Sequence, residues 1–190
     1  MAGTRSTAPI ENEVKLRVED RAAVREKLAA VGATLARARH FEDNILYDDG
    51  QHSLRGRGVV LRLRHNDQGT RLTVKGPKRE VQGVKARTEA EVTVSDGETA
   101  ETILRLLGYE PVFRYQKYRE VWRWREAEIV VDDTPVGTYL EIEGPLETIH
   151  AAARELGRGP GDYLLDSYAA LYVMAGGSGD MVFPDRAVRP

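Results

Sequence analysis

Short segments in which apolar and charged residues alternate one for one constrain this chain more than any other feature. In residues 10–18, IENEVKLRV, Val14 and Leu16 fall on one face while Glu13 and Lys15 fall on the other. A period of two is typical of a β-strand with one face in a core. Similar alternation recurs in residues 59–64, 71–76, 87–94, 114–122 and 138–144, and residues 128–133, EIVVDD, are interpreted as a further strand. The pattern predicts a series of strands, which pair antiparallel when each has one apolar face.

Helices are predicted between and after these strands. The first begins after Asp20, a residue type that caps helix N-termini well, and ends at Gly32. The others cover residues 98–107, 146–156 and 163–174. This order of elements predicts an α+β fold dominated by antiparallel strands.

The polar faces of the strands consist almost entirely of ionisable side chains. The acidic ones are Glu11, Glu13, Glu89, Glu91, Glu141, Glu143 and one of Asp132 or Asp133, and the basic ones are Lys15, Arg62, Arg64, Lys75, Arg87, Lys117 and Arg119. In an ordinary antiparallel sheet such a face lies in solvent. Alternatively, the strands curl so that the charges line a barrel, where pairing, metal or ligand must compensate them. Alternation alone leaves both arrangements open.

The overall charge and composition restrict the partners. The formal net charge is −2, so no global basic field draws the chain to nucleic acid or to an anionic membrane. Any anion site must therefore be local. The absence of cysteine excludes disulfides, thiolate metal sites and a cysteine nucleophile. The N-terminal residues lack the apolar segment of a signal peptide, and no apolar run is long enough to span a membrane. We expect a soluble, cytoplasmic protein, and a homodimer is left open.

A single domain is expected from the length of 190 residues. It covers residues 10–175. The small, polar residues 1–9 and the Gly- and Pro-containing residues 176–190 are expected to be flexible ends.

The order of the charged residues resembles that of one protein family. The domain starts with a Glu-x-Glu-x-Lys strand, formed by Glu11, Glu13 and Lys15. Further along follow, in order, Arg62-x-Arg64, Lys75, Arg87-x-Glu89-x-Glu91, Lys117-x-Arg119, Asp132 and Glu141-x-Glu143. This order is similar to that of the CYTH family, the triphosphate tunnel metalloenzymes, over about residues 10–174. The strings DDTPVGTYLEIEG and SYAAL look nearest to its bacterial class IV adenylyl cyclase-like branch. The resemblance implies an eight-stranded, antiparallel, closed β-barrel that forms a tunnel, with helices packed outside.

The resemblance also implies roles for these residues. The implied metal ligands, for two Mg²⁺ or Mn²⁺ ions, are Glu11, Glu13, Asp132, Glu141 and Glu143. The implied phosphate ligands are Lys15, Arg62, Arg64, Lys75, Arg87, Lys117 and Arg119. The implied catalytic residues are Glu11, Glu13, Lys15 and Arg119, whereas Glu89 and Glu91 are expected to orient bases or to contact metal. The residue types suit these roles, because hard divalent cations prefer carboxylate oxygens and guanidinium donors match phosphate oxygens.

The implied metal and phosphate ligands would bind a small-molecule triphosphate in the same way for either of two reactions. In a cyclase, the ribose 3′-hydroxyl of ATP attacks the α-phosphorus and pyrophosphate leaves. In a triphosphatase, water attacks the terminal phosphorus of inorganic or thiamine triphosphate. We predict cyclase-like activity from the local strings, with triphosphatase activity or binding without turnover as the alternatives.

Two groups of residues stand apart from the motifs. Some family members place a lysine on the last helix as a further phosphate ligand, but residues 163–174 contain none. Either Ser167 and Tyr168 replace it or the cradle is weaker at that end. The histidines are scattered, and surface or loop positions are predicted for His40, His52, His65 and His150.

Overall fold

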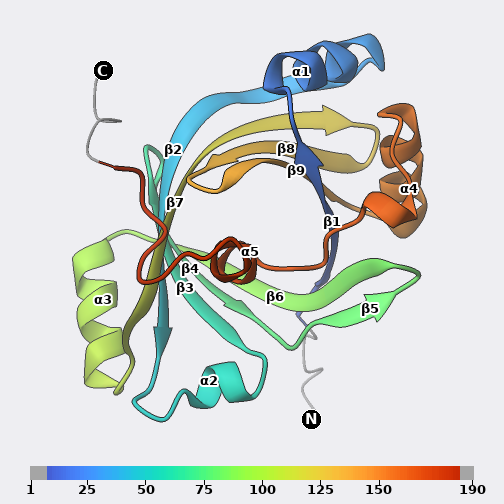
Figure 1. The fold of residues 1–190 in the computed structure, drawn as a ribbon. Helices are drawn as coiled ribbons and strands as arrows, with labels where there is room; N and C mark the ends of the chain where they lie inside the picture. The colour runs from blue at the N-terminus through green and yellow to red at the C-terminus, as the bar shows by residue number, and fades with distance from the viewer. Residues whose placement is uncertain (1–7, 185–190) are drawn as a thin grey trace, which may run out of the picture.

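Eight antiparallel strands close into a barrel, which Figure 1 shows along its axis. The structure is a computed structural model that describes residues 8–184. Around the ring the order is β1-β9-β8-β7-β2-β3-β4-β6, and β6 pairs back with β1. The strands are β1 (Ile10–Val18), β2 (Thr34–Asp48), β3 (Val60–Asn66), β4 (Gly69–Lys75), β5 (Arg79–Val81), β6 (Val84–Val94), β7 (Glu110–Trp124), β8 (Ala127–Thr134) and β9 (Gly137–Glu143). The predicted eight-stranded barrel is thus confirmed, and the short β5 is an addition that pairs with β6 alone.

Strand β1 closes the ring because its two ends pair with different neighbours. Glu13 lies opposite Lys85 of β6, and Lys15 lies opposite Glu141 of β9. The intervening Val14 is fully buried on the other face of the strand, in the core beneath the helices. Alternation therefore sends the charged face of β1 into the ring and its apolar face outward.

Strand β2 is the one strand of the ring that the alternation pattern did not predict. It is 15 residues long and pairs with β7 on one side and β3 on the other. Its register with β7 shifts at three places, the first two between Leu35 and His40. Such bulges break the alternation of side chains that identifies a strand. His40 lies buried on this strand, so the surface or loop position predicted for it is wrong.

The helices pack outside the ring of strands, except the last, which lies across an opening of the ring (Figure 1). They are α1 (Arg21–Ala30), α2 (Ser53–Gly56), α3 (Gly97–Leu106), α4 (Leu146–Glu155) and α5 (Tyr168–Met174). Asp20 caps α1 as predicted, accepting from the backbone N–H of Ala22 at 2.8 Å. Helices α1 and α4 contribute Leu28 and Ile149 to the main core against β1, β8 and β9.

The last helix is shorter than predicted. Helix α5 begins at Tyr168, where the Ser167 hydroxyl accepts from the N–H of Ala170 at 3.2 Å. Ahead of it, Leu164 pairs with Lys15 of β1 through two backbone hydrogen bonds. Residues 163–167 are therefore held against the barrel as a non-helical segment instead of extending the helix.

The segment after α5 also differs from the flexible tail expected from residue 176 onward. Met181 is fully buried, and its carbonyl accepts from the N–H of Gln116 on β7 at 2.9 Å. Residues 1–7 and 185–190, the remainder of the expected flexible ends, lie outside the described residues. Within residues 8–184, no helix has the length and apolar character needed to cross a membrane.

Candidate active site inside the barrel

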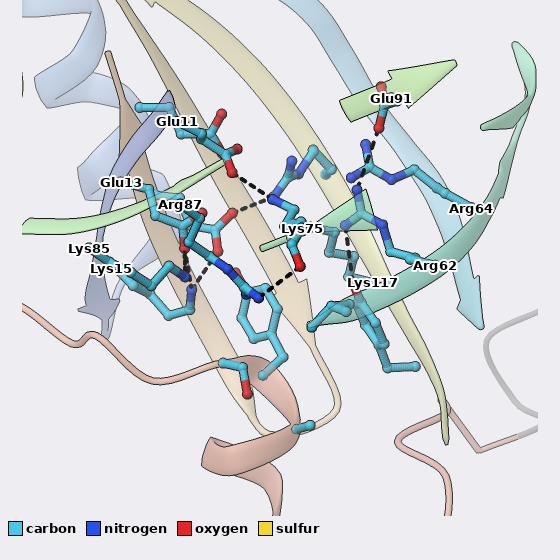
Figure 2. A pocket seen from close by; sticks show the side chains of 18 of the residues that line it. Glu11, Glu13, Lys15, Arg62, Arg64, Lys75, Lys85, Arg87, Glu91 and Lys117 are labelled. Carbon is cyan, nitrogen blue, oxygen red and sulfur yellow. Dashed lines mark hydrogen bonds and ion pairs between the residues drawn. The ribbon is translucent and has the colours of Figure 1, made fainter. Parts of the chain in front are cut away.

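Charged side chains from strands around the ring converge on a cavity of about 270 Å³ (Figure 2). All the predicted phosphate ligands line it, namely Lys15, Arg62, Arg64, Lys75, Arg87, Lys117 and Arg119. Of the predicted metal ligands, Glu11, Glu13, Glu141 and Glu143 line it as well. The charged faces thus point into the barrel, so the solvated-face alternative is excluded.

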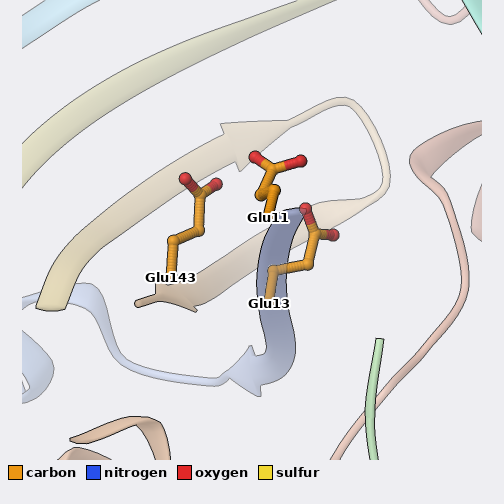
Figure 3. Close-up of side chains that lie close together, drawn as sticks. All are labelled: Glu11, Glu13 and Glu143. Carbon is orange, nitrogen blue, oxygen red and sulfur yellow. The ribbon is translucent and has the colours of Figure 1, made fainter. Parts of the chain in front are cut away.

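Three carboxylates gather at one side of this cavity. Ligand oxygens of Glu11, Glu13 and Glu143 lie within 4.8 Å of one another (Figure 3). The first two come from β1, and the third comes from β9, where it lies opposite Glu13. Burial raises the pKa of Glu143 to about 8, with the nearby charges of Glu11 and Glu13 adding to the effect. Three mutually repelling carboxylates with oxygens this close fit a divalent cation.

Glu89 lies beside this group and interacts with Glu11. Burial raises the pKa of Glu89 to about 7, and its hydrogen bond with Glu11 raises it further. Burial opposes ionisation of Glu11 too, but the hydrogen bond with Glu89 and the charge of Lys75 lower the Glu11 pKa to about 2. The pair therefore shares its proton unequally, with Glu11 ionised and Glu89 holding the proton.

Lysines contact the carboxylates from the other side. The Nζ of Lys75 lies 2.8 Å from Glu11 Oε2 and 2.9 Å from Glu89 Oε2. Lys85 of β6 donates to Glu13 Oε1. Lys85 lies two residues before Arg87 on the same strand face, so alternation extended back from Arg87 could have found it.

Asp132 and Glu141 lie in a different part of the interior, among bases. Both oxygens of Asp132 accept from Arg119, at 2.7 and 2.6 Å, and one also accepts from Lys117 at 3.0 Å. The Tyr168 hydroxyl donates to the same oxygen at 2.7 Å. Glu141 accepts from Lys15 and Arg119. The structure therefore does not bring these two predicted metal ligands together with the carboxylates of Glu11, Glu13 and Glu143.

The choice between Asp132 and Asp133 follows from which face of β8 each occupies. Asp132 is fully buried inside the ring. Asp133 instead accepts from Arg39 at 3.0 Å, and its side chain is 20% exposed. Asp132 is thus the interior residue, in agreement with the motif order.

The arginines differ in which protein groups accept hydrogen bonds from their guanidinium N–H groups. Arg62 donates to the Tyr115 hydroxyl at 3.4 Å and to the Thr73 hydroxyl at 3.2 Å. Arg87 donates instead to backbone carbonyls, at 2.7 Å to Gly76 and at 3.0 Å to Gly58. Arg87 therefore ties two loops to the barrel as well as lining the cavity.

Glu91 lies on the opposite side of the cavity from the carboxylate group. It accepts from Arg71 and from the Thr73 hydroxyl, each at 2.8 Å, and lies 3.5 Å from Arg62. Its contacts are those of a residue that orients bases.

Glu42 of β2 is a buried acid that the sequence reasoning missed. Its side chain lies 3.5 Å from both Arg64 and His40 and 3.6 Å from Lys117. Burial alone would raise the pKa of Glu42, but the charge of Lys117 and the contact with His40 hold it well below its usual range. Residues 40–46 pair regularly with β7, but both of their faces mix polar and apolar residues, so no alternation in the sequence indicated Glu42.

Tyr168 begins the last helix, the element on which some family members place a lysine. Its ring lies against the Nζ of Lys15, 4.3 Å from the ring centroid, and its hydroxyl reaches Asp132. Ser167 and Tyr168 both line the cavity. The cavity is thus lined here by an aromatic ring and a hydroxyl, and the ring contacts Lys15 of β1.

Fold and site together define a closed-barrel tunnel protein whose interior carries facing groups of acids and bases. The sequence matches the CYTH domain over residues 9–168, and the chain belongs to the CYTH family. A relative from Methanocaldococcus jannaschii, named putative adenylate cyclase, is 30% identical over 142 residues, which cover 74% of this chain and 80% of the relative.

Two solved structures share the barrel. One, described as a putative adenylate cyclase from Vibrio parahaemolyticus, superposes with a TM-score of 0.78 at 21% identity and covers 87% of this chain and 99% of its own. The other is a Hippeastrum protein described as a putative adenylyl cyclase with a dominant triphosphatase activity. It gives a TM-score of 0.66 at 21% identity, over 88% of this chain and 97% of its own. At these identities the likeness concerns the fold.

Proposed function

We propose that this chain is a metal-dependent enzyme that acts on a triphosphate inside the barrel, with adenylyl cyclase-like conversion of ATP to cyclic AMP and pyrophosphate. One observation carries the proposal: the carboxylates of Glu11, Glu13 and Glu143 face a cradle of lysines and arginines across a single cavity. A site for an anion alone gains nothing from clustered acids, and a site for a metal alone gains nothing from so many bases. A metal–triphosphate complex uses both.

The chain's own residues then have distinct tasks. Glu11, Glu13 and Glu143 would hold a Mg²⁺ or Mn²⁺ ion, which when bound withdraws charge from phosphate oxygens. Lys15, Lys117 and the arginines would bind the phosphates and offset charge that builds on the leaving group. Asp132 and Glu141 would hold Lys15, Lys117 and Arg119 in place, because their oxygens already bind those bases. A second metal site would require Asp132 and Glu141 to give up these contacts.

The cyclase reading uses the 3′-hydroxyl of bound ATP as the nucleophile. Its oxygen forms the new bond to the α-phosphorus, the bond from that phosphorus to the pyrophosphate oxygen breaks, and the hydroxyl proton leaves to solvent or to the pyrophosphate. The relative with 30% identity, which is named for this reaction, supports it.

A triphosphatase is the second candidate, and the size of the cavity favours it. At about 270 Å³, the space lies below the roughly 300–1,000 Å³ typical of sites that enclose drug-sized molecules. A bare triphosphate needs only the charged cradle, whereas ATP also needs room for the nucleoside. Water would then attack the terminal phosphorus and free phosphate would leave.

A product assay tests both readings. Purified protein with Mg²⁺ or Mn²⁺ receives ATP, inorganic triphosphate or thiamine triphosphate in separate reactions, beside a Glu11→Gln control that keeps the side-chain shape. Cyclic AMP and pyrophosphate from ATP, lost in the control, are expected. Phosphate release without cyclic AMP would establish the triphosphatase instead, and no turnover of any substrate would contradict an enzymatic function.

A further inference from the structure

Lys85 is a basic residue of the cavity that the motif order does not contain. It lies on β6, directly opposite Glu13 of β1, and its Nζ donates to Glu13 Oε1 (Figure 2). Its side chain is 11% exposed and lines the cavity. An ammonium group therefore sits at one of the three carboxylates proposed to hold the metal.

Lys85 is held less firmly than the other lysines near this group. Lys75 contacts both Glu11 and Glu89, and Lys15 contacts Glu141 as well as lying 4.0 Å from Glu13. Within the described part of the chain, Glu13 is the only ion-pair partner of Lys85. Of the three lysines, Lys85 thus has the fewest contacts to lose if Glu13 binds something else.

We propose that Lys85 is a mobile counter-ion, which pairs with Glu13 while the metal is absent and moves to the triphosphate when the metal binds Glu13. The inference rests on the proposed function. An ammonium and a divalent cation repel each other, so a metal ion bound to the carboxylate of Glu13 weakens the pairing of Lys85 with it. The flexible four-carbon stem of lysine lets the displaced group turn within the cavity, where the triphosphate supplies the strongest negative charge.

This exchange couples the two ligands. In the absence of metal, Lys85 is engaged by Glu13 and contributes little to triphosphate binding. Once metal occupies Glu13, Lys85 adds a phosphate contact, so the metal strengthens triphosphate binding. By linkage, the triphosphate strengthens metal binding by the same factor.

The test measures tripolyphosphate affinity by calorimetry twice for each protein, in EDTA and at saturating Mn²⁺. For Lys85→Met we expect nearly wild-type affinity in EDTA and a loss of about fivefold or more at saturating Mn²⁺, within the usual range of coupling between sites. Lys85→Arg, which keeps the charge and the reach, should restore most of the Mn²⁺ effect. Lys78→Met, which removes the charge of an exposed lysine in the loop before β5, should leave both affinities unchanged.

The outcomes separate this inference from the proposed function. An equal loss of affinity under both conditions for Lys85→Met would make Lys85 a fixed phosphate ligand and overturn the exchange, as would no loss under either. Wild-type protein that binds tripolyphosphate under neither condition would overturn the proposed function and this inference with it. Thermal unfolding of each variant verifies that it is folded before binding is measured.

Discussion

Individual charged residues in this barrel differ in how completely their neighbours compensate them. Asp132 receives hydrogen bonds from Lys117, Arg119 and Tyr168. Glu143 instead faces two other carboxylates, and its pKa is raised to about 8. These two acids are therefore expected to respond in opposite ways to loss of charge.

Replacement of Glu143 by glutamine should stabilise the metal-free protein at alkaline pH. An ordinary glutamate has a pKa of 4.5, against about 8 for folded Glu143. Between these values the folded state binds the extra proton, so the free energy of unfolding falls as pH rises. Glu143→Gln should flatten this slope and raise the free energy of unfolding by on the order of 2 kcal/mol near pH 8.

Thermal unfolding in EDTA from about pH 5 to about pH 8 measures this pH dependence in the wild-type protein and in Glu143→Gln. Equal slopes in the two proteins would contradict the prediction, and Glu19→Gln, at an exposed position, is the control.

Replacement of Asp132 by asparagine should destabilise the protein. It leaves the buried charges of Lys117 and Arg119 without their main counter-ion. Removing one partner of a buried ion pair costs about 3–5 kcal/mol. Chemical denaturation of Asp132→Asn should show such a loss, whereas Asp133→Asn, on the outer face of the same strand, should lose at most about 1 kcal/mol. Similar losses for the two variants would argue against the interior role of Asp132.

At the scale of elements, helix α1 is held to the barrel by a buried acid on the outside of β7. Glu120 accepts from Arg21 at 3.3 Å, from Arg25 at 3.0 Å and from the indole N–H of Trp122 at 2.6 Å. Its side chain is 3% exposed. The face of β7 that carries Glu120 and Trp122 therefore packs against helix α1. It is not cleanly apolar in sequence because Glu120 accepts hydrogen bonds from two arginines of that helix.

Glu120→Gln should therefore loosen α1 without affecting the tunnel. We expect a loss of roughly 1–3 kcal/mol in unfolding free energy, because a buried acceptor for charged donors is weakened. Tripolyphosphate affinity should stay at the wild-type value, since Glu120 faces away from the cavity. Hydrogen exchange would locate the change in α1, and protection lost instead in the barrel strands would contradict the assignment. Glu126→Gln, in an exposed turn, provides the comparison.

At the scale of the whole molecule, closure of the ring brings the acids of β1 and β9 to face the bases of β3, β4 and β7. A ligand that satisfies both groups binds only the closed barrel, so it must stabilise folding. Metal with tripolyphosphate at about a hundred times its Kd contributes about 2.7 kcal/mol.

This ligand stabilisation should appear as a rise in thermal midpoint. For a chain of this size, about 2.7 kcal/mol corresponds to roughly 5–11 °C. Differential scanning calorimetry with Mn²⁺ alone, tripolyphosphate in EDTA, and both together measures it, and the combined shift should exceed either alone. Glu11→Gln should lose the contribution of the metal. No shift with any combination would rule out a ligand site in the barrel.

Much of this architecture could be predicted from the sequence because the signals were local. Alternation and apolar runs identified seven strands of the ring, and the ordered charges identified the family and seven basic residues that line the cavity, although not Lys85. Strand β2 could not be found because bulges shift its register before His40 and after Leu46, and Glu42 was missed because the regular stretch between them mixes polar and apolar residues on both faces. The start of α5 at Tyr168 depends on the bridge between Leu164 and Lys15, which no local propensity encodes.

The sequence by itself determined which residues are charged and which face of each strand they share. Only the tertiary structure decided how those charges pair, because pairing depends on which strands become neighbours when the ring closes. Register places Glu143 beside Glu13, whereas Asp132 lies among Lys117 and Arg119. The same closure sets Lys85 against Glu13, a contact between residues 72 positions apart that no local pattern contains.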